Sequence, residues 1–179
     1  MIKKFKSQRV LLGSGADSTV YLAKNRNKAL KVYESTSHSN LVQYKNMLDF
    51  LSTNLKSILE DQNFGLKISQ LESKLNRSID FKITPLKQIK RINKSTTLGV
   101  CEFINGNSVY DIFFTQDQAV NKLSNYKYEI LNLISTIFQK ITCLSGTEFD
   151  FVNVKLKYDD ENVVFIFTDI LSRVYLFDF

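Results

Sequence analysis

Two glycines, Gly13 and Gly15, stand one residue apart in the segment LLGSGADSTVYLAK, between two runs rich in apolar and β-branched residues. A glycine-rich turn between two strands brings backbone N–H groups close to phosphate oxygens, because no side chain stands in the way. The same glycines also suit an ordinary turn of a β-meander. The segment therefore predicts a phosphate-binding hairpin, with a plain turn as the alternative.

A lysine, Lys31, stands in the next apolar run, ALKVYE, between Leu30 and Val32. A lysine in such surroundings either meets a partner or points outward from a strand whose side chains alternate between two faces. Both interpretations stay open on the residues alone.

Strands must position these residues in the first third of the chain. RVLLGSG, STVYLAK and ALKVYE are short runs separated by turns, and they predict a three-stranded meander. NLVQYKNMLDFLSTNLKSILE, from residue 40 to 60, has apolar residues at helical spacing after STSHSN, a stretch that suits an N-cap. We expect a long amphipathic helix there, and a shorter helical piece around ISQLESKL.

The rest of the chain predicts two more strands, further helices and a hairpin. DFKITPLKQIKRI and TTLGVCEFI read as one strand each, joined by the turn NKS. Apolar residues between about 117 and 143 fall on one side of a long helix. VNVKLKY and VVFIFTD flank the acidic turn DDEN and predict a hairpin. The expected fold class is α+β.

The order of these elements, with the residues at their ends, resembles the protein-kinase family. Gly13 to Val20 is similar to its G-x-G-x-x-G-x-V loop, with Ser18 in place of the third glycine, and Ala29-Leu30-Lys31 is similar to its A-x-K. The resemblance implies that Lys31 holds the phosphates of ATP and that Val20 and Ala29 contact adenine. The cofactor-binding residues implied in this way are Gly13, Ser14, Gly15, Ser18, Val20, Ala29, Lys31, Glu102 and Ile104, the last two in the hinge EFINGNS.

Asn153 and Asp169 lie on either side of the expected hairpin, where the family places its two Mg²⁺ ligands. Asp169 begins Asp169-Ile170-Leu171 in place of D-F-G, so the glycine of that motif is absent. In the family a helix carboxylate also orients the lysine. The candidates here are Asp49, Glu60 and Glu72.

The catalytic loop, GTEFDFVN, departs from the family's H-R-D motif. Glu148 occupies the position of the catalytic aspartate, five residues before Asn153, and no histidine precedes it. The extra methylene of a glutamate displaces the carboxylate by about an ångström, enough to slow phosphoryl transfer. Asp150 is the alternative base. If neither acts, the chain is a pseudokinase.

The resemblance spans nearly the whole chain and implies a two-lobed protein-kinase-like fold with a five-stranded antiparallel N-lobe and a strongly reduced helical C-lobe. We expect the N-lobe over residues 1–104 and the C-lobe over 105–179. Only ten residues follow Asp169, which leaves no room for a full activation segment. In plan the chain is similar to the shortened effector kinases that some pathogenic bacteria inject into host cells.

Composition sets limits on partners and location. The chain has a net charge of +6, but its Lys and Arg residues alternate with Asp and Glu without a dense basic run, so we do not expect nucleic-acid binding. Cys101 and Cys143 lack ligand spacing and are expected to be buried thiols. No window approaches about 18 uninterrupted apolar residues, so we expect no membrane span. The expected location is the cytoplasm, with delivery into a host cell for an effector.

The leading hypothesis is an ATP- and Mg²⁺-dependent protein serine/threonine kinase of minimal size, which needs a protein substrate or an activating partner protein. The alternative is a pseudokinase or nucleotide-binding scaffold that acts through protein–protein interaction. A small-molecule kinase ranks third. The family resemblance implies that such enzymes carry a longer helical half for the acceptor, which we do not expect in this chain.

Overall fold

The structure is a computed structural model of the 179-residue chain, and it describes residues 9–14, 18–24, 27–34, 36–114, 122–145 and 151–168. These residues form two units. The first contains the described residues up to 49 and residues 84–104, and the second contains residues 50–83 and the described residues from 105 to 168. Each unit has its own β-sheet.

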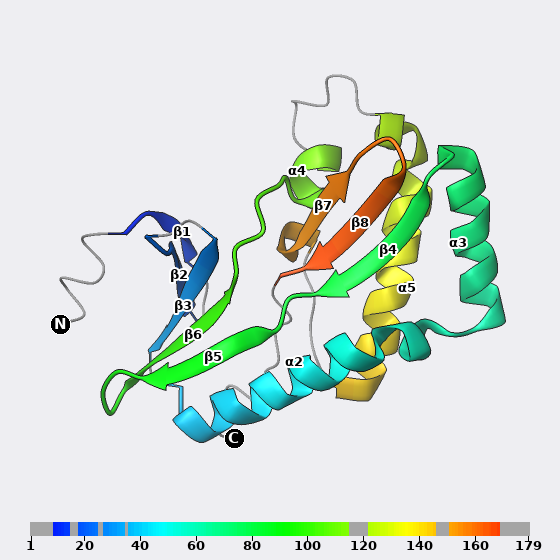
Figure 1. The fold of residues 1–179 in the computed structure, drawn as a ribbon. Coiled ribbons are helices and arrows are strands. Elements are labelled where there is room, and N and C mark those ends of the chain that lie inside the picture. The colour runs from blue at the N-terminus through cyan, green and yellow to red at the C-terminus, as the bar shows by residue number, and fades with distance from the viewer. Residues whose placement is uncertain are drawn as a thin grey trace. The chain divides into compact units, whose positions relative to one another are not determined.

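The first unit is built on a five-stranded sheet in which every neighbouring pair is antiparallel (Figure 1). In their order across the sheet, the strands are β1 (Leu11–Ser14), β2 (Ser18–Leu22), β3 (Lys28–Glu34), β6 (Thr96–Glu102) and β5 (Leu86–Arg91). The meander and the five-stranded antiparallel sheet expected from the sequence are confirmed, as is the α+β class.

Helix α2 (His38–Leu59) follows β3 and begins two residues before the predicted start at residue 40, within the stretch STSHSN. Ser37 is its N-cap, because the Ser37 hydroxyl accepts a hydrogen bond from the Asn40 N–H at 3.1 Å. The apolar residues that the periodicity singled out, Tyr44 and Leu51 among them, are buried. This helix runs from the first unit into the second.

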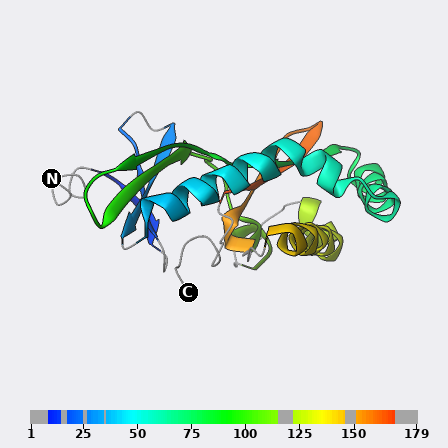
Figure 2. The same ribbon diagram turned by 90° about the horizontal axis from the view of Figure 1, so that it is seen from below.

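The second unit has a three-stranded sheet in the order β4-β8-β7 and most of the helices. Its strands are β4 (Ser78–Ile83), β7 (Val154–Tyr158) and β8 (Asn162–Phe167), and its helices are α3 (Gln62–Leu75), α4 (Val109–Phe114) and α5 (Lys127–Ser145), with short 3₁₀ turns η1 (Lys122–Tyr126) and η2 (Phe151–Asn153). Figures 1 and 2 show α5 along one face of this sheet, where Phe138 of α5 meets Phe167 of β8 edge to face.

Three expectations about these elements were wrong. DFKITPLKQIKRI is two strands, β4 and β5, because Pro85 has no N–H for a ladder and keeps Thr84 from continuing one. Strand β4 pairs in parallel with β8 rather than within the five-stranded sheet. Cys143 is exposed, and it lies near the end of α5, two residues beyond the buried Ile141.

Two helices differ in extent from the prediction. Helix α3 begins six residues earlier than ISQLESKL, at Gln62, because the Asp61 carboxylate caps it by accepting a hydrogen bond from the Phe64 N–H at 3.0 Å. The long helix near the end begins as the 3₁₀ turn η1 before α5, while residues 117–121 lie outside the described residues. Within the described part of the chain, no helix has the length and apolar character required to cross a bilayer.

Candidate functional site

Strand register places Val20, Ala29 and Lys31 on one face of the five-stranded sheet. Lys31 lies opposite Val20 of β2, and Ala29 lies two residues before Lys31 on β3. Residues directly opposite each other and residues two apart share a face, because strand side chains alternate. The glycine hairpin and the lysine strand therefore present these three residues together.

Lys31 is buried, with 6% of its surface exposed. The opposite face of β3 is packed in a core that includes Leu30 and Val32, so the lysine belongs to the other face. Ordering a lysine in such a place loses both hydration and side-chain freedom, which makes a buried lysine uncommon outside a binding or catalytic site.

The glycine hairpin is open at its first glycine. Gly13 lies opposite Val20 in the β1–β2 pair, and a Cβ built there would meet nothing within 4 Å. The hydroxyls of Ser14 and Thr19 lie 3.4 Å apart across the hairpin. Ser18 begins β2 and is half-buried, whereas Gly15 lies outside the described residues. Packing within the described hairpin leaves room beside Gly13 for a ligand.

Gly99 of β6 lies directly opposite Lys31 on the other side of β3. A Cβ there would come within 3.1 Å of the side chains of both Leu86 and Tyr33. A side chain at this position would therefore fit only if Leu86 and Tyr33 moved by a few tenths of an ångström. Gly99 was not among the expected site residues, and the glycine within the apolar run TTLGVCEFI was the signal for it.

The hinge segment follows β6 without a break. Glu102 is exposed and forms an ion pair with Lys87 at 3.6 Å, while Ile104 is buried. The N–H of Phe103 donates to the Asn27 carbonyl at 3.1 Å. Within the described part of the chain, the N–H of Ile104 has no acceptor. The hinge thus keeps a main-chain donor available.

In the second unit, Asn153 ends η2 immediately before β7 and is half-buried. Its carbonyl accepts a hydrogen bond from the Thr168 N–H and another from the Thr168 hydroxyl, each 2.9 Å long. Thr168 directly precedes Asp169, which lies outside the described residues together with Glu148 and Asp150. Asn153 is thereby tied to the residue just before the expected metal ligand.

A short helix packs beside this hairpin. The Ser108 hydroxyl donates to the Asp111 carboxylate at 2.6 Å, and the Asp111 N–H donates to the Ser108 oxygen at 3.0 Å, which caps α4. The Ser108 hydrogen bond holds the pKa of Asp111 below its usual value. The Leu156 N–H then donates to the Asn107 carbonyl at 3.1 Å, so the segment before α4 borders β7.

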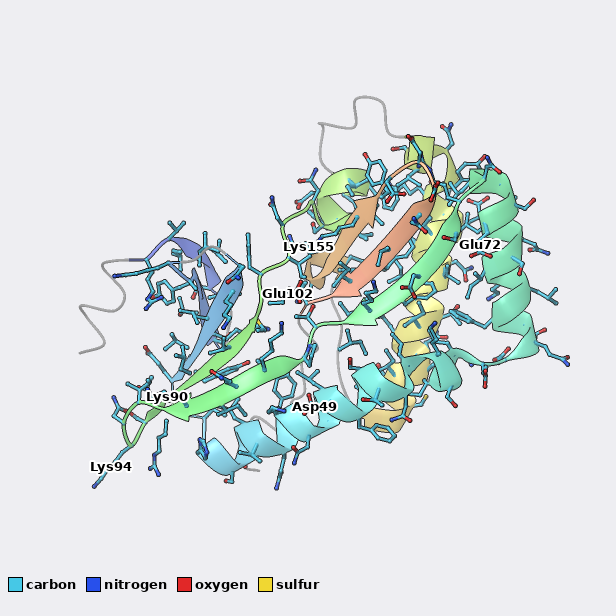
Figure 3. All side chains as sticks on the ribbon, in the orientation of Figure 1. Asp49, Glu72, Lys90, Lys94, Glu102 and Lys155 are labelled. Atoms are coloured by element: carbon cyan, nitrogen blue, oxygen red, sulfur yellow. The ribbon has the colours of Figure 1, made fainter. Side chains whose placement is uncertain are left out.

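The three carboxylates proposed to orient Lys31 lie in different surroundings. Figure 3 labels two of them, Asp49 and Glu72. Glu72 of α3 accepts a hydrogen bond from the Ile79 N–H at 2.8 Å. Glu60 is exposed just beyond the end of α2. Asp49 is half-buried on α2, forms an ion pair with Lys45, and belongs to the same unit as Lys31.

Among the described residues, no group of three or more His, Cys, Asp or Glu side chains is arranged to hold a metal ion. The expected Mg²⁺ pair joins Asn153 to Asp169, and only the first of the two is described. The metal role of these residues stays a prediction.

No protein-family model matches the chain, and no curated protein matches its sequence. Solved structures that resemble it include the PknI kinase domain of Mycobacterium tuberculosis, with 16% identity, a TM-score of 0.42, and 92% of this chain covered. Another is Rad53 in complex with AMP-PNP, with 18% identity, a TM-score of 0.47 and 84% of this chain covered. A third is the apo GRMZM2G135359 pseudokinase, with 12% identity, a TM-score of 0.43 and 90% of this chain covered. The chain spans 59% of the PknI domain, 34% of the Rad53 chain and 56% of the pseudokinase.

Proposed function

We propose that the chain is a minimal ATP- and Mg²⁺-dependent protein kinase of the serine/threonine type. The observation on which the proposal rests is the shared face of Val20, Ala29 and the buried Lys31 behind a glycine hairpin. A fixed cation beside a small apolar surface suits a nucleotide, whose phosphates are anionic and whose base is flat and weakly polar.

The first unit binds the nucleotide in this proposal. Val20 and Ala29 contact adenine, and the small Ala29 side chain leaves space for the ring. The main chain between Glu102 and Ile104 hydrogen-bonds the base, with the Ile104 N–H as the donor. Lys31 holds the α and β phosphates, and the loop that includes Gly13, Ser14, Gly15 and Ser18 covers the phosphates with its N–H groups.

The second unit supplies the metal ligands. Asn153 and Asp169 contribute an amide oxygen and a carboxylate, which are hard ligands of the type that Mg²⁺ prefers. The two hydrogen bonds between Asn153 and Thr168 support this role, because they hold the position before Asp169 next to Asn153. Bound Mg²⁺ neutralises charge on the transferring phosphoryl group.

Asp49 is our choice for the carboxylate that orients Lys31. It lies in the same unit and is half-buried, so its charge is less screened than that of the exposed Glu60. The Glu72 carboxylate is already engaged by the Ile79 N–H. Asp150 or Glu148 accepts the proton of the substrate hydroxyl.

A pseudokinase is the second candidate, and the residues in the catalytic loop favour it. Glu148 replaces the expected aspartate, and Asp169-Ile170-Leu171 lacks the glycine of D-F-G. Such a protein binds ATP, or no nucleotide, and acts through its surface. In either case we propose a partner protein, which is a substrate or activator for the kinase and a binding partner for the pseudokinase. We propose cytoplasmic action, in a host cell for an effector.

Nucleotide binding is the first test, measured as the thermal stabilisation of the full chain by ATP and Mg²⁺. At an ATP concentration 100-fold above Kd, specific binding adds about 2.7 kcal/mol to the free energy of unfolding. Lys31→Met removes the charge but keeps most of the volume, and we expect it to abolish most of this gain. Lys28→Met is the matched control, because Lys28 lies on the same strand but is exposed. Equal stabilisation of all three proteins would contradict the role of Lys31.

Phosphate transfer is the second test. The full chain is incubated with labelled ATP, Mg²⁺ and a cell lysate, beside Lys31→Ala and Asp169→Ala variants. We expect labelling of lysate proteins only with the parent chain. Binding of ATP without labelling would identify the pseudokinase, and equal labelling in all three reactions would refute the kinase.

A further inference from the structure

The three-stranded sheet of the second unit has two unlike faces. Phe81 of β4 stacks on Phe165 of β8 with ring centroids 5.6 Å apart, and Phe64 of α3 lies 6.1 Å from Phe81. Val154 and Leu156 of β7 belong to the same face by alternation, and both are buried. This face is the packed side of the sheet.

Lys155 belongs to the opposite face. It lies between Val154 and Leu156 in sequence, pairs with Ile166 of β8, and is half-buried. Asn153 and Thr168, which the two 2.9 Å hydrogen bonds join, form the next pair beyond Val154 and Phe167 in the hairpin. Lys155 thus lies two residues from Asn153 at this end of the hairpin, and Figure 3 labels Lys155 on β7.

The Lys155 ammonium group has Asp111 as an acidic neighbour but forms no ion pair with any of the described residues. Asp111 of α4 is the acidic group that faces it, and the lysine helps to hold the pKa of Asp111 low through space. The Asp111 carboxylate is engaged by the hydroxyl and the N–H of Ser108, at 2.6 and 3.1 Å. Among the described residues, none forms a salt bridge with Lys155.

Strand geometry sets the distance between Lys155 and a ligand at Asn153. Asn153 ends η2 directly before β7, so it lies two residues from Lys155 and, even if the chain is extended there, only about 6.6 Å away. A lysine side chain has four methylene groups and reaches a comparable distance, so its ammonium group can contact an anion bound beside Asn153. The buried Ile166 next to Lys155 lowers the local dielectric, which strengthens such a contact.

We propose that Lys155 binds the phosphate groups of the nucleotide, as a second cation that acts from the side of Asn153. This proposal rests on the proposed function and adds a phosphate ligand to that site. Lys155 then adds a positive charge beside Asn153 that offsets phosphate charge. A chain whose catalytic loop departs from the kinase pattern gains in this way an electrostatic contribution that the loop motif itself does not provide.

The competing explanation is that Lys155 only offsets the charge of Asp111. The two explanations differ in what they predict for ligands with and without phosphate. Loss of a residue that binds phosphate weakens the binding of ATP and not that of adenosine. Loss of a residue needed only for local structure weakens the binding of both ligands alike.

Calorimetric titration of the full chain with ATP and with adenosine, both in the presence of Mg²⁺, makes the comparison. We expect Lys155→Met to weaken ATP binding about ten-fold or more and to leave adenosine binding unchanged, and Lys155→Arg to retain most of the ATP affinity. Lys157→Met is the matched control, because Lys157 lies on the same face of β7 but is exposed. Lys157→Met should bind both ligands as the parent chain does.

Three results would overturn the role of Lys155: ATP affinity unchanged in Lys155→Met, an equal loss for ATP and adenosine, or an equal loss in Lys157→Met. If the parent chain binds ATP and Lys31→Met does not, these results contradict Lys155 alone. If the parent chain binds neither ligand, the proposed function and the role of Lys155 fail together.

Discussion

The carbonyl of Asn153 accepts both polar hydrogens of Thr168, the N–H and the hydroxyl, at 2.9 Å each. The ladder between β7 and β8 ends with the pair Val154 and Phe167, so this double contact extends the hairpin by one residue on each strand. It connects η2 to the position before Asp169. In the proposed site, the spacing between Asn153 and Asp169 depends on it.

Thr168→Val tests this connection. The substitution removes the hydroxyl and keeps the branched shape, so the Asn153 carbonyl retains only the N–H donor. We expect the free energy of unfolding to fall by about 1 kcal/mol, the usual net value of one hydrogen bond. Urea denaturation measures the change, and Mg²⁺–ATP titration should show weaker binding as well.

Thr136→Val is the control for Thr168→Val. The Thr136 hydroxyl also donates to a main-chain carbonyl at 2.9 Å, that of Asn132, but this contact lies within α5 and is solvent-exposed. We expect a change of only a few tenths of a kcal/mol, because such a bond competes with water and with the helix ladder. Equal losses in the two variants would show that the Asn153–Thr168 contact has no special weight.

The cap of α4 predicts a pH dependence. The Ser108 hydroxyl, which is fully buried, is the main cause of the low pKa of Asp111. A carboxyl whose pKa is lowered by folding stabilises the protein above its ordinary pKa of 3.8, and this contribution is lost as the pH falls through the folded value. We therefore expect Asp111→Asn to destabilise the chain at pH 7 and to have a smaller effect at pH 3.

Urea denaturation across that pH range compares Asp111→Asn with Asp160→Asn, whose carboxylate is fully exposed and lies 3.9 Å from Arg77. The Asp160 variant should follow the parent chain at every pH. Ser108→Ala should cost about 1 kcal/mol at pH 7, as the loss of a helix cap does. An Asp111→Asn penalty that stays constant down to pH 3 would contradict the assigned role of the charge.

The strands and the helix that could be predicted from the sequence are those set by interactions between residues close in sequence. The alternation of VYL and ALKVY and the turn between them predicted β2 and β3, while the resemblance to the kinase motifs identified Val20 and Lys31, which the register places opposite each other. The 3.6-residue period similarly identified α2. These signals are local, because each comes from one element and the turn beside it.

The strand pairings and contacts that could not be predicted are those between segments far apart in sequence. Strand β4 pairs in parallel with β8, with Ser78 opposite Asn162, and no local pattern specifies such a partner. Thr168 acquires its role only when the hairpin register puts it beside Asn153. Pro85 was a readable signal that the strand containing it breaks, and its weight was missed.

Gly99 lies in a crowded position and Gly65 in an open one, so we expect substitution by alanine to have opposite effects on stability at the two positions. Gly99→Ala puts a methyl group 3.1 Å from the side chains of Leu86 and Tyr33, so we expect a loss of about 1 to 3 kcal/mol from overpacking. Gly65 lies inside α3, and a Cβ there would meet nothing within 4 Å. Gly65→Ala should therefore stabilise the chain by about 0.5 to 1 kcal/mol through helix propensity. Thermal unfolding of the two variants measures both signs, and stabilisation by Gly99→Ala would contradict the tight packing opposite Lys31.

Glu72 and Asp49 predict different consequences when each loses its charge. The Glu72 carboxylate bonds the Ile79 N–H at 2.8 Å at the start of β4, so Glu72→Ala leaves that donor without its partner and should cost about 1 to 2 kcal/mol. Glu72→Gln keeps an oxygen acceptor, so it should be nearly neutral in urea denaturation. Because we assign the orientation of Lys31 to Asp49, Glu72→Gln should also leave ATP binding unchanged, whereas Asp49→Asn should weaken it.

Titration of both amide variants with ATP and Mg²⁺ settles which carboxylate serves Lys31. The two substitutions are matched, since each replaces one carboxylate oxygen by an amide nitrogen without changing the length of the side chain. A loss of ATP affinity in Glu72→Gln, with Asp49→Asn unaffected, would transfer the role to Glu72.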